Sequence, residues 1–165
     1  MATTYEPIAT NTLTSTSTSV TFSSIAGTYT DIVVIISGSM SANANVIMQF
    51  NGATTLYSSR SLNGNGTAAA SSYFGSGSPS IPNPTGIYID TLGTGTGSFQ
   101  YIVNIMNYAN TTTFKTAISR FGAAAMGTEE TVGLYRSTSA ITSVTFLNGT
   151  FGIGTVFTLY GIKAA

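Results

Sequence analysis

Histidine, cysteine and tryptophan are absent from this chain of 165 residues. Without histidine and cysteine, the chain lacks the commonest general base, the thiol nucleophile and the usual transition-metal ligands. The lack of cysteine also excludes a disulfide framework and leaves the redox compartment open. No Asp-x-Asp cluster supplies the several oxygen ligands that calcium needs. We therefore expect no metal and no cofactor.

Charge is scarce as well. Five basic and five acidic residues make up 6% of the chain and cancel, whereas about 25% is usual for a soluble domain. A neutral surface offers no field that attracts nucleic acid or anionic lipid, and we expect neither a nucleic-acid nor a membrane partner. The basic residues are scattered: Arg60, Lys115, Arg120, Arg136 and Lys163. Little repulsion opposes association, which favours a protein that works assembled; a well-behaved neutral monomer is the alternative.

Long hydrophobic runs are missing too. The longest apolar patch, Ile32–Ile36, has the length of a strand, whereas a membrane-spanning helix needs about 18 residues or more. The first residues show no basic region followed by an apolar one, so we expect no signal peptide. Hydrophobic residues at 42% and a mean hydropathy of +0.28 argue against disorder. The length suits a single domain over residues 1–165.

What the chain does contain is a series of short β-patterns. In Ile141–Leu147, Val144 and Phe146 point one way and Thr145 the other, which is typical of a half-buried strand. Thr155–Lys163 is apolar on both faces, so it must be covered on both, inside a sandwich or an assembly. Further strands are predicted at Val20–Phe22, Thr30–Ser37, Asn45–Asn51, Thr54–Arg60, Gly86–Asp90, Ser98–Tyr108, Thr112–Phe121 and Thr131–Arg136, and Tyr5–Ala9 is expected to be a short extended arm.

These patterns predict an all-β fold, an antiparallel, jelly-roll-like β-sandwich of about eight to ten strands. No helical period is sustained anywhere in the sequence. The Asn51-Gly52 dipeptide predicts a hairpin that pairs the strands on either side of it. Phe114 and Ile118 are expected to point inward from their strand. The segment Ser61–Thr85, rich in Gly, Pro and Ser, is predicted to be a long irregular loop.

The carboxylates in the sequence give little evidence for catalysis. A two-carboxylate mechanism needs a converging pair, and only Glu129 and Glu130 are neighbours. Adjacent residues on a strand point to opposite faces, and we interpret these two as a solvated loop end before a strand. We therefore expect a protein that is not an enzyme. An enzyme acting on polysaccharide is the least favoured hypothesis for its function.

One region suggests binding. The aromatic residues and one arginine around the predicted loop lie beside Asn63 and Asn65: Tyr57, Arg60, Tyr73, Phe74 and Tyr88. Aromatic faces with uncharged amides suit sugars, whose C–H faces stack on rings while their hydroxyls bond to amides. These residues therefore form a candidate surface for a glycan or a partner. The alternative is that the rings pack against the sandwich or a neighbouring subunit.

Several segments carry a family resemblance: Met1–Thr10 (MATTYEPIAT), Thr21–Asp31 (TFSSIAGTYTD), Tyr101–Arg120 (YIVNIMNYANTTTFKTAISR), Val132–Arg136 with Ile141–Ser143, and Phe157–Ala165 (FTLYGIKAA). In these the chain resembles a type of small structural protein, or terminal module, of tailed bacteriophages, especially those of cyanobacteria and other aquatic hosts. The resemblance implies a β-sandwich component of the virion: a capsid decoration (cement) protein or a head- or tail-fibre module, commonly a homotrimer. It implies no catalytic or binding residue.

The hypothesis from sequence is therefore a virion structural protein whose partners are copies of itself and major capsid or tail proteins. The opening residues 1–10 are a candidate assembly arm, because an extended segment can add to the sheet edge of a neighbour. Tyr5, Glu6, Pro7 and Ile8 lie at its centre, and Pro7 cannot donate to a sheet, which suggests an edge position. A carbohydrate-binding adhesin that contacts host-surface glycan through Ser61–Tyr88 is the alternative function.

Overall fold

The structure, a computed structural model, describes residues 4–78, 81–93 and 95–163. Within these ranges the chain forms antiparallel strands and no helix. None of the described residues belongs to a helix that could cross a bilayer. The strands are β1 (Tyr5–Thr12), β2 (Ser17–Phe22), β3 (Asp31–Met40), β4 (Ile47–Phe50), β5 (Tyr57–Gly64), β6 (Ala69–Phe74), β7 (Ile87–Tyr88), β8 (Gly97–Met106), β9 (Lys115–Ala123), β10 (Gly127–Tyr135), β11 (Val144–Phe151) and β12 (Val156–Ile162).

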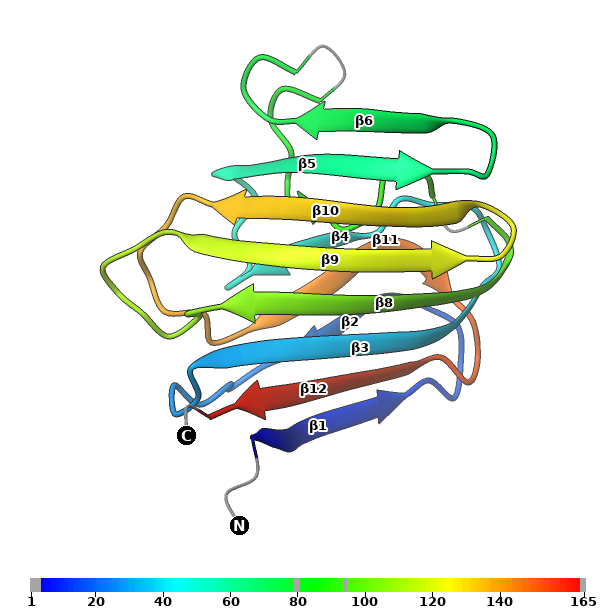
Figure 1. Ribbon diagram of the computed structural model, residues 1–165. Coiled ribbons are helices and arrows are strands. Elements are labelled where there is room, and N and C mark those ends of the chain that lie inside the picture. The colour runs from blue at the N-terminus through cyan, green and yellow to red at the C-terminus, as the bar shows by residue number, and fades with distance from the viewer. Residues whose placement is uncertain (1–3, 79–80, 94, 164–165) are drawn as a thin grey trace.

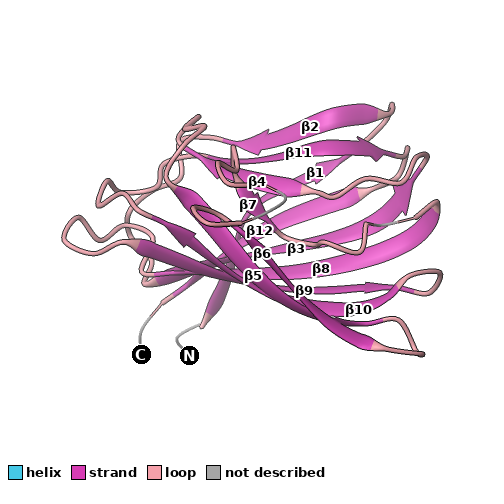
Figure 2. Cartoon of the chain, turned by 90° about the horizontal axis from the view of Figure 1, so that it is seen from above, coloured by secondary structure: helices cyan, strands magenta, loops and turns pink. Residues whose placement is uncertain are grey.

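Two layers make up the fold. Eight strands pair in the order β6-β5-β10-β9-β8-β3-β12-β1 and form the front layer in Figure 1. Behind them, β2, β11, β4 and β7 pair in that order. Figure 2 shows the two layers from above, with β2, β11 and β4 on one side and β5, β9 and β10 on the other. The predicted antiparallel sandwich is confirmed.

The layers meet at one end. Met40 at the end of β3 pairs with Phe151 of β11, which links the two sheets into a nearly closed antiparallel structure. The chain passes repeatedly from one layer to the other, for example from β2 to β3 and from β11 to β12. This alternation is jelly-roll-like. The twelve strands of the described chain exceed the predicted number because residues 61–74 and 5–12 carry more strand than their composition indicates.

The core lies between the layers and follows the period-two pattern. In β8, Tyr101, Val103 and Ile105 are fully buried while Ile102 is exposed. The C-terminal strands behave as the sequence predicts, with Val144 and Phe146 inward. The largest fully buried apolar side chains are Tyr101, Tyr108, Phe50, Phe146, Phe151, Phe157, Ile32, Ile36, Met48, Ile87 and Ile89. Burial of this set removes apolar surface from water and is the main force that holds the layers together.

Three expectations about local structure are wrong. The Asn51-Gly52 turn does not make a hairpin: β4 pairs with β11 and β7, while the following β5 pairs with β10 and β6 in the other layer. The turn does occur, with Asn51 and Gly52 both at positive φ. The predicted loop over 61–85 contains the second half of β5 and the whole of β6, which pair as a hairpin. In β9 the inward face is polar at two positions, Lys115 and Ser119, so Phe114 is exposed and Ile118 faces outward.

Candidate functional site

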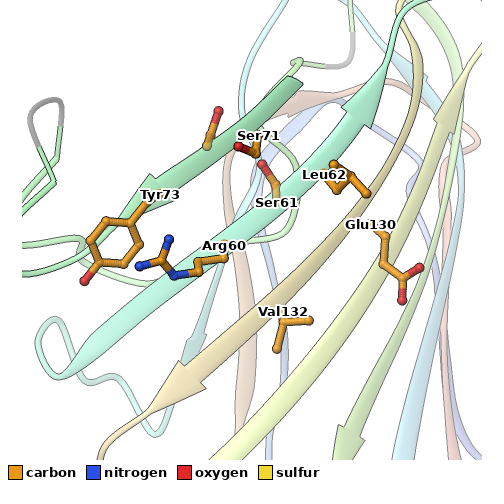
Figure 3. Close-up of a pocket in the computed structure, with 8 residues that line it drawn as sticks. Arg60, Ser61, Leu62, Ser71, Tyr73, Glu130 and Val132 are labelled. Carbon is orange, nitrogen blue, oxygen red and sulfur yellow. The ribbon is translucent and has the colours of Figure 1, made fainter. Parts of the chain in front are cut away.

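A groove runs along the outward face of β5, β6 and β10. Its central hollow of about 440 Å³ is lined by Arg60, Ser61, Leu62, Ser71, Ser72, Tyr73, Glu130 and Val132. Figure 3 shows Arg60, Leu62 and Val132 on the same side of the sheet. The pairing register explains this, because Arg60 lies opposite both Tyr73 and Val132 on the neighbouring strands. The groove combines an apolar floor with one cation, one carboxylate and hydroxyl groups.

Arg60 and Tyr73 form the polar end of the groove. The guanidinium carbon of Arg60 lies 4.1 Å from the centre of the Tyr73 ring, which is a cation–π contact. The Tyr73 hydroxyl donates to the carbonyl of Ser76 at 2.8 Å, which fixes the ring. Two residues of the predicted binding surface are therefore together and partly accessible. They line a shallow surface that can hold a planar or ring-shaped ligand.

Tyr57 does not belong to this surface. Its side chain is 2% exposed and stacks on Tyr135, with ring centres 4.7 Å apart. Its hydroxyl accepts the N–H of Phe50 at 2.9 Å and donates to the backbone carbonyl of Phe50 or Ala53. Burial raises the pKa of Tyr57 to about 12. The alternative interpretation of this residue, packing inside the sandwich, is the one the structure supports.

Phe74 and Tyr88 face away from the groove. Their rings stack on each other at 4.5 Å, between the β5–β6 hairpin and β7. Tyr88 is anchored by its backbone N–H, which donates to the Ser59 hydroxyl at 3.0 Å. The five residues predicted as one surface are thus divided between the groove, the core and this stacked pair. Their closeness in sequence could not show the division, because it depends on which side of β5 and β6 each residue takes.

The candidate assembly arm is an edge strand of its own chain. Tyr5 to Thr12 form β1, which pairs with β12, and the register shifts between Pro7 and Ala9. Glu6 forms an ion pair with Lys163 at 2.8 Å, and Ile8 packs against the core. The edge position suggested by Pro7 is confirmed, and the role in assembly stays a prediction. Deleting residues 1–10 would remove a strand of the sandwich, so a deletion is a poor test of that role.

Glu129 is the first of two buried carboxylates behind the groove. It lies in β10 at 5% exposure, while its neighbour Glu130 is exposed on the opposite face. One oxygen of Glu129 accepts the backbone N–H groups of Thr91 and Leu92 at 2.9 and 3.0 Å. The other accepts the hydroxyls of Thr91 and Thr131. The interpretation of Glu129 as a solvated loop end is wrong, because the side chain points inward and holds the loop after β7.

Asp90 is the second buried carboxylate behind the groove. It is fully buried and accepts the N–H groups of Val46 and Gly93 at 2.9 and 3.0 Å, together with the Tyr101 hydroxyl. Burial raises its pKa to about 7, and the charge of Glu129 adds to the increase while the hydrogen bonds oppose it. Burial also raises the pKa of Tyr101 well above its usual value. Asp90 thus joins three segments that are distant in the sequence.

The chemistry open to these two carboxylates is structural. Every oxygen of Asp90 and Glu129 already accepts a hydrogen bond from a loop or a neighbouring strand. Among the described residues, no group of three or more His, Cys, Asp or Glu side chains could hold a metal ion. Sequence reasoning missed this pair because 39 positions separate the two acids. The one available signal was an acidic residue at the end of one predicted strand (Asp90) and another just before a second predicted strand (Glu129).

The stability of the chain should depend on pH through Asp90. Its folded-state pKa of about 7 lies above the ordinary value of 3.8, so the folded state binds this proton more tightly. The contribution of the Asp90 proton to the free energy of unfolding is complete below pH 3.8 and is lost as the pH rises through about 7. For one such group the free energy of unfolding falls by up to about 1.4 kcal/mol per pH unit.

Urea unfolding at a series of pH values measures this dependence. Asp90→Asn removes the titrating group, so we expect a flatter profile between pH 4 and pH 7 than in the wild type. The absolute stability of the variant is not the test, because the new amide must face one of the N–H groups that Asp90 accepts. Asp31→Asn, at a half-buried site, is the matched control. Parallel profiles for the wild type and Asp90→Asn would contradict the assignment.

Comparison of the sequence with protein-family models and with curated proteins finds no match.

Proposed function

We propose that this chain is a non-enzymatic structural protein of a virion, assembled on the capsid or tail of a tailed bacteriophage. In this role it binds copies of itself and major capsid or tail proteins, as a decoration (cement) or fibre component. A protein that binds only the assembled shell stabilises it by mass action, because binding shifts the equilibrium away from disassembly. Its location would be the virion.

One observation carries the proposal: the surface is nearly uncharged and exposes large hydrophobic side chains. Charged residues make up 6% of the chain, and among the described residues seven large hydrophobic side chains are exposed: Tyr5, Leu56, Leu62, Ile102, Phe114, Val132 and Ile153. Such a surface provides little repulsion between copies and gains free energy when it is covered. The resemblance in Met1–Thr10, Tyr101–Arg120 and Phe157–Ala165 supplies the virion as the setting and implies a homotrimer.

The test is the amount of this chain in purified particles. Particles from a phage that encodes the chain are purified on a density gradient and their proteins are quantified by mass spectrometry. The proposal predicts many copies per particle, in a fixed ratio to the major capsid or tail protein. A chain that stays in the soluble fraction of the lysate, with none in the particles, would refute it.

The groove supports a second function, a carbohydrate-binding adhesin that contacts host-surface glycan. Here Tyr73 would stack on a sugar ring while Arg60 and Ser71 bind its hydroxyls. A glycan array should then show saturable binding that Tyr73→Ala weakens about tenfold or more. Tyr160→Ala, at a half-buried tyrosine outside the groove, is the control and should bind as the wild type. An array without binding, or equal binding by Tyr73→Ala, would reject the adhesin.

A further inference from the structure

The outward face of the eight-stranded sheet carries apolar side chains on most of its strands. Strand register places the outward residues in rows across the sheet. One row, from β1 to β6, is Thr10, Thr158, Ile35, Ile102, Arg120, Glu130, Leu62 and Ser71. The next is Pro7, Tyr160, Val33, Asn104, Ile118, Val132, Arg60 and Tyr73. Each row therefore puts apolar side chains on strands that the sandwich does not cover from outside.

Exposure shows that this face is open over β8, β10 and β5 in the single chain, whereas Val33 of β3 is only 3% exposed. Ile102 is 38% exposed, Val132 48% and Leu62 66%, and Tyr5 at the β1 end is 56% exposed. Four of the seven exposed large hydrophobic residues thus lie on one face. Sheets that face water on one side ordinarily alternate apolar-in with polar-out. Here the outward positions break that rule on β8, β10 and β5, and the fold gives no internal reason for it.

The size of the face matches what a protein pair needs. Eight strands about 4.8 Å apart and four outward rows, the two above and one row on either side of them, cover on the order of 800 Å². A stable protein–protein interface buries about 800 Å² on each partner. Two twisted antiparallel sheets can stack face to face, as the two layers of a sandwich do, because both have the same twist. The face is therefore large enough and of the right geometry to pack on another sheet of the same kind.

The balance of charges favours a second copy of this chain as the partner that covers the outward face. The charged residues in the outward positions of the eight strands are two of each sign: Arg60, Arg120, Glu130 and Asp31. Arg120 and Glu130 already pair on neighbouring strands at 3.9 Å. A face with no net charge has nothing to attract a basic or acidic partner, whereas it meets an identical face without repulsion.

We propose that two copies of this chain pair face to face through the outward surface of the eight-stranded sheet. The inference rests on the proposed function, since it names the surface through which the copies assemble. A face that packs on itself gives a two-fold dimer, whereas a trimer needs the face to contact a different patch of the neighbour. The proposed oligomer is therefore a two-fold dimer and not the homotrimer that the resemblance implies.

Two substitutions can disrupt the face while sparing the fold. Ile102 lies directly opposite Arg120, and Val132 lies directly opposite Arg60. In Ile102→Glu and Val132→Glu each new carboxylate thus meets an arginine across the strand, which supports the sheet of the single chain. In the pair, the same carboxylates would be buried against apolar side chains of the other copy, at a high cost in desolvation. Ile153→Glu, at a 67% exposed site between β11 and β12, makes the same charge change outside the face.

Sedimentation velocity of the full chain over a concentration series is the measurement. We expect the wild type and Ile153→Glu to form a species of twice the 17.0 kDa mass of one chain. Each glutamate in the face should raise the dissociation constant about tenfold or more, and the double variant should be monomeric. Circular dichroism and thermal unfolding verify that the variants fold.

Three results would overturn the inference: a wild-type monomer at every concentration, a stable species of three copies, or a dimer that the double variant leaves intact. If the glutamates do unfold the chain, Leu62→Lys serves instead, because its ammonium lies opposite Glu130. None of these results decides the proposed function, which is judged by the amount of the chain in purified particles. A chain that is abundant in particles and monomeric in solution would refute the pair alone.

Discussion

Replacing Lys115 with methionine is expected to lower the free energy of unfolding by about 3 kcal/mol, because three buried carbonyls lose their hydrogen-bond donor. The Lys115 side chain is fully buried at the start of β9. Its ammonium donates to the backbone carbonyls of Asn110, Thr113 and Thr138 at 2.5, 2.8 and 3.2 Å. It thereby ties the β8–β9 connection to the segment after β10. Burial lowers the pKa of Lys115, so these carbonyls are what offsets the cost of its charge.

Methionine would keep the length of the side chain and remove the donor. Three carbonyls would then lose their hydrogen bond, and an unpaired buried polar group costs about 1–3 kcal/mol. Chemical denaturation of Lys115→Met beside Lys163→Met measures the effect. Lys163 is half-exposed and pairs with Glu6 on the surface, so its replacement should cost much less than that of Lys115, because water screens an exposed ion pair. Equal losses in the two variants would show that Lys115 does not organise these connections.

Replacing Gly133 with valine should cost a similar amount, about 3 kcal/mol. Gly133 lies in β10 on the inward face, directly against the Ile87 side chain of β7. A Cβ atom built at this position overlaps three carbons of Ile87. Ile87 is 1% exposed and cannot turn into solvent. The two layers would therefore have to move apart where β7 crosses β10, which opens voids in a close-packed interior.

Gly122 supplies the matched control. It lies in the adjacent strand β9, and a Cβ atom built there meets no heavy atom within 4 Å. Gly122→Val should therefore leave the stability unchanged or raise it, because valine suits a strand better than glycine does. Thermal and urea unfolding of the two variants compare the effects. A loss at Gly122 as large as that at Gly133 would contradict the packing argument.

The fold class could be predicted from the sequence because the apolar residues alternate wherever one face of a strand is buried. Val144 and Phe146 in β11 show this, as does the continuous apolar run of β3. The inward face of β9 could not be predicted, because Lys115 and Ser119 occupy positions where apolar residues are expected and Phe114 lies outside. Phe114 and Ile118 take outward positions in this segment, whereas the polar Lys115 and Ser119 take inward ones.

The candidate site was only partly predictable, for reasons of distance along the chain. Arg60 and Tyr73 meet because β5 continues into residues 61–85 and pairs there with β6, whereas the composition of that segment indicates a loop. Asp90 and Glu129 act on neighbouring loop residues only after the two layers pack. The apolar outward face also depends on strand order, since its rows join residues from both ends of the sequence. Local patterns carry no information on such order.

Cryo-microscopy of a particle that contains this chain would show whether the chain acts through assembly. We expect repeated β-sandwich density on the capsid or tail, in which the outward face of the eight-stranded sheet is buried against another copy. Particles that lack this density, with the chain recovered only as a free monomer, would contradict it.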